Sequence, residues 1–254
     1  METKEFLVET ALLMHGLSSI QNNYIQAVMP PEVDNLCWVE TGKIKVGQFQ
    51  EFARFRSFCS VQRLDYNGLI NALNTQRSGV LTASGTIRAA EILGRKLVIS
   101  SGIGGISKIK DEQLCPDLPA LKDTNIQLIA TAFKDMINYP VTFAWLKQRG
   151  VTWFVDSKNE VFDGFLFNLP SKESWTMPIA RTTAQLCLRP IDSRKRLAEN
   201  SWIEIAYKKA LEASKQGIPF HPAFSAALDQ LSSGISSFLA LESLIDNIRY
   251  VLNK

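Results

Sequence analysis

Histidine is scarce in this chain, and its scarcity limits the chemistry that the chain can perform. Only two histidines occur, His15 and His221. A zinc site with three histidine ligands is therefore impossible, and a serine or cysteine triad must use one of these two as its base. His15, before a glycine, is typical of a turn, and His221, before a proline, is typical of a helix start. Carboxylates and lysines are thus expected to carry any catalysis.

Lys134 and Glu9 are the two groups best placed for such catalysis. Lys134 follows the apolar run IQLIATAF, at the end of a predicted buried strand. Desolvation there would lower the pKa of its amine and make it a Schiff-base nucleophile, although a lysine that reaches solvent from a strand end fits the same pattern. Glu9 lies inside the first apolar run, either as a surface carboxylate or as a buried general acid with a raised pKa.

Two further features could bind a ligand. The loop SSGIGG, residues 100–105, follows a predicted strand, and its glycines let backbone N–H groups converge on an anion. The loop is neither a dinucleotide fingerprint nor a Walker loop, and a simple turn explains it equally well. Asp117, in the segment CPDL, has the position of a helix N-cap.

The elements that must position these residues alternate between strands and helices. The segments NLCWVETG and KIKVG predict two strands joined by a turn at Thr41-Gly42, and SGTIRAAEILG predicts a helix that ends at Gly94. The runs IQLIATAF, VTFAWLKQRG and VTWFVDS predict strand, helix and strand, and the last third of the chain is helical in periodicity. We therefore expect an α/β fold, a three-layer α/β/α sandwich with a helical C-terminal layer, as a single domain over residues 1–254.

The composition excludes several classes of protein. The 254 residues are 46% hydrophobic and 21% charged, with a net charge of +3, which suits a globular protein and argues against nucleic acid or a membrane surface as partner. The start of the sequence is acidic where a signal peptide is basic, and no apolar run has the length of a membrane span. The four cysteines form no CxxC pair, which fits a reducing cytoplasm: Cys37, Cys59, Cys115 and Cys187. A cytoplasmic location is the expectation.

Seven segments in order carry a family resemblance. They are VETALLMHGLSSIQN, TGKIKVG, SGVLTASGTIRAAEILGRKLVISSGIGG, CPDL, IATAFKDMI, RPIDSR and SLIDNIRYVLNK. Together they resemble the pseudouridine-5′-phosphate glycosidase family, which includes the indigoidine-cluster A proteins and C-nucleoside synthases. CPDL is similar to the family's SADL, and IATAFKDMI to its VCAG-KSIL lysine segment. The resemblance covers nearly the whole chain.

The resemblance implies a site and a reaction. Members of the family act on the carbon–carbon bond between ribose C1′ and uracil C5, opening the sugar ring with a glutamate and holding C1′ as a lysine imine. Glu9 matches that acid and Lys134 that lysine. The resemblance places substrate contacts at seven further positions: Arg63, Thr82, Ala83, Cys115, Pro116, Asp117 and Asn247. It implies a sugar phosphate and a heterocyclic base as small-molecule partners, a bound Mn²⁺, and a homotrimer.

Several positions depart from the family pattern. The Mn²⁺-binding aspartate is replaced by Gln113, a neutral and poor ligand for a hard cation, which puts the metal in doubt. Arg63 stands for a lysine on the phosphate side, keeping the charge with a different geometry. Cys115 and Pro116 replace serine and alanine, and Ser107 replaces a histidine.

Three interpretations remain open from the sequence. The chain is a lyase or synthase acting on a C–C bond between a ribose 5-phosphate-type sugar and a heterocycle or aromatic ring, either uracil or another, or it is a housekeeping pseudouridine-5′-phosphate glycosidase that tolerates the substitutions. Alternatively it is a non-catalytic protein that binds a sugar phosphate or a partner protein. Joint retention of Glu9, Lys134, Asp117 and Asn247 favours the first two.

Overall fold

The first strand shows why the central sheet is buried on both faces. All three residues of β1 (Phe6–Val8) are buried: Phe6 and Val8 pack into one apolar cluster, and Leu7 packs into another. Side chains of a strand alternate between faces, so a strand that is apolar throughout must be covered on both sides. The computed structural model describes residues 5–17, 19–57, 61–107, 114–157, 162–169, 184–218 and 220–254.

The sheet contains two sets of parallel strands, and the strands of one set are antiparallel to those of the other. Its order is β10 (Trp153–Val155), β11 (Leu186–Leu188), β8 (Gln127–Ala130), β6 (Leu97–Ile99), β1, β2 (Leu36–Glu40), β5 (Gly79–Leu81) and β4 (Gln62–Leu64). The strands from β10 to β2 pair in parallel. β5 is antiparallel to β2, and β4 is parallel to β5. The carboxyl ends of β1 and β5 therefore approach each other from opposite directions.

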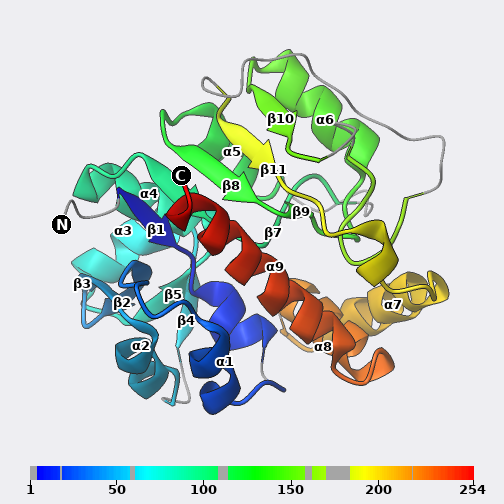
Figure 1. Ribbon diagram of the computed structural model, residues 1–254, viewed down its shortest axis with the longest axis horizontal. Coiled ribbons are helices and arrows are strands. Elements are labelled where there is room, and N and C mark those ends of the chain that lie inside the picture. Colours follow the sequence, from blue (N-terminus) through cyan, green and yellow to red (C-terminus); the bar gives the residue numbers. More distant parts are fainter. Residues whose placement is uncertain are drawn as a thin grey trace.

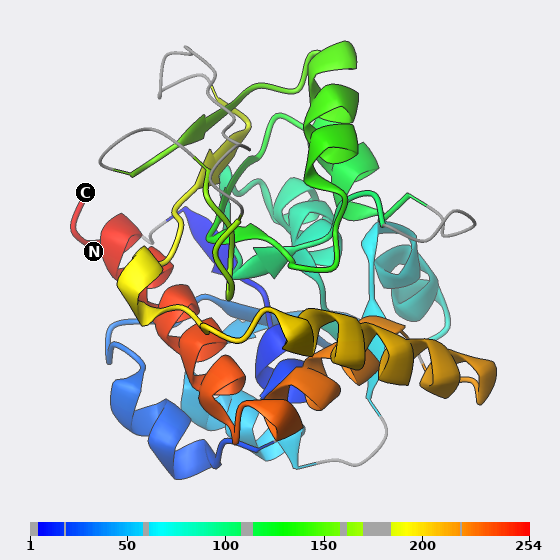
Figure 2. The ribbon, with the colours of Figure 1, turned by 90° about the vertical axis from the view of Figure 1, so that its right-hand side faces the viewer.

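Helices cover both faces of this sheet (Figure 1). One face is covered by α1 (Asn22–Val28), α2 (Phe49–Arg56) and α9 (Ile235–Leu252), whose apolar residues share a cluster with Phe6 and Val8. The other face is covered by α3 (Tyr66–Asn74), α4 (Ala83–Leu93), α5 (Asp117–Lys122) and α6 (Tyr139–Gln148). Figure 2 shows α7 (Ser201–Lys215) and α8 (Phe220–Leu231) side by side. The predicted α/β/α class with C-terminal helices is confirmed.

Two local predictions are confirmed in detail. β2 and β3 (Lys43–Gly47) form an antiparallel hairpin, and the two turn residues Thr41 and Gly42 have φ of 47° and 70°. α4 ends at Gly94, which is left-handed with φ 66° and donates its N–H to the carbonyls of Ala90 and Glu91. The hairpin turn and the end of α4 both require positive φ, which glycine adopts without strain at Gly42 and Gly94.

The run IQLIATAF forms two strands where the sequence predicted one. β8 stays in the central sheet, whereas β9 (Ala132–Phe133) pairs in parallel with β7 (Gly102–Ile103) in a separate small sheet. The backbone N–H of Thr131 donates to the carbonyl of Ser101 where the two sheets meet. This bend carries Lys134 away from the central sheet. Among the described residues, no helix has the length and apolarity to cross a membrane.

Candidate active site

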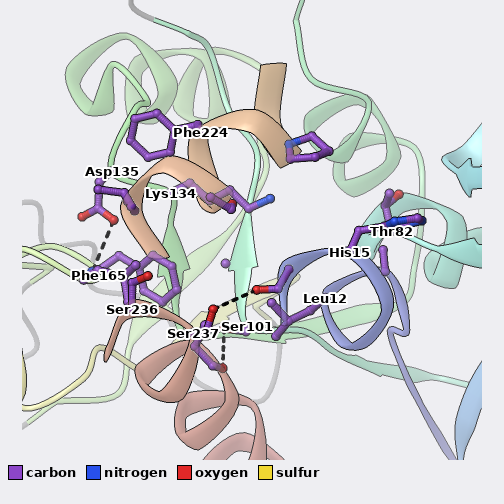
Figure 3. A pocket seen from close by; sticks show the side chains of 18 of the residues that line it. Leu12, His15, Thr82, Ser101, Lys134, Asp135, Phe165, Phe224, Ser236 and Ser237 are labelled. Carbon is purple, nitrogen blue, oxygen red and sulfur yellow. Dashed lines mark hydrogen bonds between the residues drawn. The ribbon is translucent and has the colours of Figure 1, made fainter. Parts of the chain in front are cut away.

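A cavity of about 810 Å³, counting its opening to solvent, lies where the two sets of strands converge. Glu9 directly follows β1, and Thr82 directly follows β5. The N–H of Thr10 donates to the carbonyl of Leu81, which joins these two strand ends. Lys134 enters the cavity from the end of β9, and residues of α8 and of the start of α9 complete the lining (Figure 3). Carboxyl ends of strands at a switch in sheet direction are a common place for ligand sites in α/β proteins.

Glu9 and Lys134 are brought together in this cavity, and each changes the pKa of the other. Burial raises the pKa of Glu9 to about 7, although the charge of Lys134 acts in the opposite direction. Burial lowers the pKa of the Lys134 amine, and the charge of Arg63 lowers it further. The nearby Asp117 raises both pKa values. The cavity therefore favours a protonated carboxyl and a neutral amine over two charged groups.

A π-helix shapes the segment that follows Glu9. Residues Leu12–Gly16 are π-helical, where the sequence predicted a turn at His15. Leu12, His15 and Gly16 line the cavity. The guanidinium of Arg56 donates to the carbonyls of residues 13, 17 and 20, which fixes this segment against α2. Single turns of π-helix are rare and are frequently found at functional sites.

Asp117 lines the cavity and is not the N-cap of its helix, because Pro116 occupies that position. One carboxylate oxygen of Asp117 accepts the N–H of Ser84 at 3.0 Å, and the other accepts the N–H of Gly104 at 2.8 Å. In the glycine loop, for which the sequence left anion binding and a simple turn open, the N–H of Gly104 thus binds a carboxylate of the protein. A Cβ on Gly104 would lie 2.1 Å from the Cys115 sulfur, so only glycine fits there.

Three other predicted contact residues reach the same cavity. Arg63, on β4, Thr82 and Ala83 all line it. Thr82 is the N-cap of α4, and its hydroxyl accepts the N–H of Gly85 at 3.3 Å. The positive charge of Arg63 also lowers the pKa of His15 and His221, after burial. For His221 the charge of Lys134 lowers the pKa more than the charge of Arg63 does, so both cations act on the groups around the cavity.

The remaining predicted contacts lie outside the cavity lining. Asn247 is buried behind the strand ends: its Nδ2 donates to the carbonyl of Ser100 at 2.8 Å and to the hydroxyl of Thr131 at 2.9 Å, and its Oδ1 accepts from Arg189. The amide of Asn247 is thus engaged by protein groups, and its contact with substrate stays a prediction.

Cys115 and Pro116 are also absent from the lining. The Cys115 sulfur is turned toward the glycine loop, and Pro116 is exposed at the start of α5. Gln113 lies outside the described residues. Within the described ranges, no group of three or more His, Cys, Asp or Glu side chains is placed to hold a metal ion. The described residues therefore offer no fit for the Mn²⁺ that the resemblance implied.

Sequence reasoning missed several residues of the lining. Asp135 is buried beside Lys134, and its position after the lysine was the signal that could have found it. Phe165 comes from a segment without any motif, and Phe224 looks like an ordinary core residue of a helix. Ser236 and Ser237 come from the start of α9. Nothing in their spacing indicates that these residues meet.

Comparison with known proteins places the chain in a family. The sequence model of the family described as "Indigoidine synthase A like protein" matches residues 8–237. The chain belongs to this family. The resemblance drawn from the seven segments is thereby confirmed. A pseudouridine-5′-phosphate glycosidase of Arabidopsis thaliana is 26% identical over 200 residues, which are 70% of this chain and 59% of that protein. One of Geobacillus kaustophilus is 24% identical over 230 residues, 83% of this chain and 74% of that protein.

Two solved structures share the fold of this indigoidine synthase A-like chain. The prealnumycin C-glycosynthase in complex with ribulose 5-phosphate has a TM-score of 0.73 at 21% identity, covering 97% of this chain and 88% of that one. An indigoidine synthase A-like protein from Thermotoga maritima has a TM-score of 0.74 at 16% identity, covering 98% of this chain and 92% of that one. At these identities the likeness establishes the fold.

Proposed function

We propose that this chain makes or breaks a carbon–carbon bond between C1′ of a ribose 5-phosphate and a carbon of a heterocyclic or aromatic ring. The observation that carries the proposal is the pairing of Glu9 and Lys134 in one cavity, with the pKa of the acid raised and that of the amine lowered. The pseudouridine-5′-phosphate glycosidases and the C-glycosynthase among its relatives support it.

The first steps open the sugar and attach it to Lys134. Protonated Glu9 donates its proton to the ring oxygen O4′, and the electrons of the C1′–O4′ bond go to that oxygen. The neutral amine of Lys134 then bonds to C1′, and its surplus proton returns to the Glu9 carboxylate. A neutral amine is required because an ammonium group has no free electron pair. The raised pKa of Glu9 keeps a proton available at neutral pH.

The next step breaks the carbon–carbon bond. The nitrogen lone pair closes an imine between Lys134 and C1′, the electrons of the C1′–ring bond stay with the ring carbon, and that carbon takes the proton of Glu9. Water then hydrolyses the imine and releases ribose 5-phosphate, and the proton left on the amine returns to Glu9. The same steps in reverse join a ring to the sugar. Ordinary glycoside hydrolysis cannot achieve this, because a carbon leaving group has no lone pair to protonate.

The phosphate is assigned to Arg63. The N-terminus of α4 is less suited, because the N–H of Ser84 is bound to Asp117 and the N–H of Gly85 is bound to Thr82. Arg63 lines the cavity and can bind two phosphate oxygens at once. No step is routed through a metal. The homotrimer and the cytoplasmic location stay predictions, and sedimentation of the purified protein measures the first.

Reductive trapping tests the proposal. Borohydride added with ribose 5-phosphate should attach the reduced sugar to Lys134, as read by peptide mass spectrometry. Lys134→Met should abolish the adduct, whereas Lys122→Met, at the exposed end of α5, should leave it unchanged. A folded wild-type protein that binds ribose 5-phosphate without an adduct would indicate a non-catalytic sugar-phosphate-binding protein instead.

A further inference from the structure

Lys134 divides the lining of the cavity into two parts that differ in their residues. Figure 3 shows Phe165, Phe224 and Ser236 on one side of the lysine, and His15 and Thr82 on the other. Arg63, assigned above to the phosphate, pairs with Val80 on the neighbouring strand, two residues before Thr82, and therefore belongs to the Thr82 side of the cavity. The side with the two phenylalanines is therefore left for whatever is joined to the sugar.

Phe165 and Lys134 both pack against Gly102. A Cβ built on Gly102 would lie 2.8 Å from Cε1 of Phe165 and 3.1 Å from Cγ of Lys134. The ring edge and the lysine stem therefore lie close together over this glycine, whose missing side chain leaves room for both. A flat molecule bonded to a carbon on the Lys134 amine would pass alongside the Phe165 ring. Stacked or edge-to-face contact with an aromatic ring stabilises such a molecule beyond the area it buries.

Hydrogen bonds fix the backbone on both sides of Phe165, so that its ring can form one wall of the cavity. The Asp135 carboxylate accepts the N–H of Leu166 at 3.4 Å and the N–H of Phe167 at 3.2 Å. The buried guanidinium of Arg196 donates to the carbonyl of Asp163 at 2.6 Å. The same segment begins at Phe162, whose ring packs among other buried aromatic rings.

Three of the polar side chains that line the cavity, those of Asp135, Ser101 and Ser237, are already hydrogen-bonded within the protein, whereas Ser225 and Ser236 also line it. Both oxygens of Asp135 accept backbone N–H groups. The hydroxyl of Ser101 is bound to Ser243, and the hydroxyl of Ser237 is bound to the carbonyl of Gly16. Uracil carries two N–H groups and two carbonyls, and each one left without a partner on burial weakens binding.

A phenolic ring needs fewer hydrogen-bond partners than uracil does. Its one hydroxyl can be met by Ser236, which lies beside Phe165 (Figure 3). Its oxygen also donates electrons to the ring, which makes a ring carbon nucleophilic enough to attack an imine. The rest of its surface is apolar and matches Met136, Leu166 and Leu228.

We propose that the Phe165 side of the cavity binds a planar, mostly apolar aromatic ring with a hydroxyl group in preference to uracil, and that Phe165 determines this preference. The proposal names the acceptor of the function proposed above and rests on it. Phe165 acts as a flat wall, and Phe224, on α8, faces the same space.

Binding without sugar phosphate tests the inference, because no reaction can then occur. Calorimetric titration of 1-naphthol and of uracil into the wild-type chain should give a Kd for 1-naphthol at least about tenfold lower. Phe165→Ala should raise the Kd of 1-naphthol about tenfold, and Phe165→Leu, which keeps the apolar volume, should raise it less. Phe238→Ala is the matched control, since Phe238 is an exposed phenylalanine of α9, and it should leave the Kd unchanged.

Each outcome decides the matter. Equal or tighter binding of uracil, no binding of 1-naphthol, or a Phe165→Ala variant within about twofold of the wild type overturns the inference. If Phe165→Ala fails to fold, Phe165→Leu carries the comparison. Borohydride trapping of ribose 5-phosphate on Lys134 is measured in parallel. Normal trapping with no preference for 1-naphthol refutes the acceptor alone, whereas loss of trapping in the wild type refutes the proposed function.

Discussion

The raised pKa of Glu9 predicts that this side chain contributes a loss of stability as the pH rises. In the unfolded chain a glutamate releases its proton near pH 4.5, whereas folded Glu9 keeps it until about pH 7. Between these values the folded state holds more protons than the unfolded state, so raising the pH favours unfolding. A pKa raised from 4.5 to about 7 corresponds to a loss of about 3 kcal/mol across this window.

Glu9→Gln removes this dependence, because the amide carries no proton to release and stays neutral. The side chain is 5% exposed, so solvent screens it little. Relative to the wild type, the variant should therefore lose about 3 kcal/mol less unfolding free energy between about pH 4.5 and about pH 8. Burial raises the pKa of Asp135 to about 7, which adds a slope in the same direction, and lowers the pKa of His221 to about 3, which adds a slope in the opposite direction. Both groups are present in the variant and in the wild type, so the difference between the two proteins reports Glu9.

Urea unfolding followed by circular dichroism at a series of pH values measures the effect. Glu5→Gln is the matched control, since Glu5 lies just before the same strand, is exposed and is paired only with exposed Lys96 at 3.6 Å. Its pH dependence should follow the wild type. Identical slopes for Glu9→Gln and the wild type would refute the assignment of a buried, protonated Glu9, and with it the supply of a proton for ring opening.

Three further substitutions test how the site is built. Asp117→Asn places an amide N–H against one of the two backbone N–H groups whose hydrogen bonds the carboxylate accepts. The variant should lose about 2–4 kcal/mol of unfolding free energy and have a higher KM for the sugar phosphate. A variant as stable as the wild type contradicts this role of Asp117. Gly85→Ala would bring a Cβ to 2.2 Å from the carbonyl oxygen of Leu64, and a shifted α4 should lower thermal stability; an unchanged melting temperature counts against this packing. Asn247→Ala should cost about 2–3 kcal/mol in urea unfolding but still allow borohydride trapping on Lys134, and loss of trapping in a folded variant would return Asn247 to the site.

The sequence predicted elements whose cause is local. The hairpin at Thr41-Gly42 and the end of α4 at Gly94 depend on residues that adopt positive φ, and such signals can be read from a few neighbouring positions. Lys134 and Glu9 were found because each interrupts or ends an apolar run. The cavity brings them together, as the family resemblance implied.

The sequence could not predict features that depend on distant partners. The π-helix after Glu9 needs Arg56, which lies more than a full helix and hairpin away in the chain. Asp117 has the pattern of an N-cap, yet its carboxylate is taken by N–H groups from two other elements. Asn247 matched a family motif, but whether its amide faces a ligand or a carbonyl is decided by how α9 packs against the strand ends.

The site joins the two ends of the chain, which has a consequence for folding during synthesis. The hydroxyl of Ser237 reaches the carbonyl of Gly16 across 221 positions, and Asn247 reaches Ser100 across 147. Contacts so distant in sequence close slowly, because much of the chain must be ordered first. A nascent chain on the ribosome can build β1 and its neighbours early, but their apolar face waits for α9. During that interval the polypeptide is open to aggregation, and the binding site is complete only once α9 has been released.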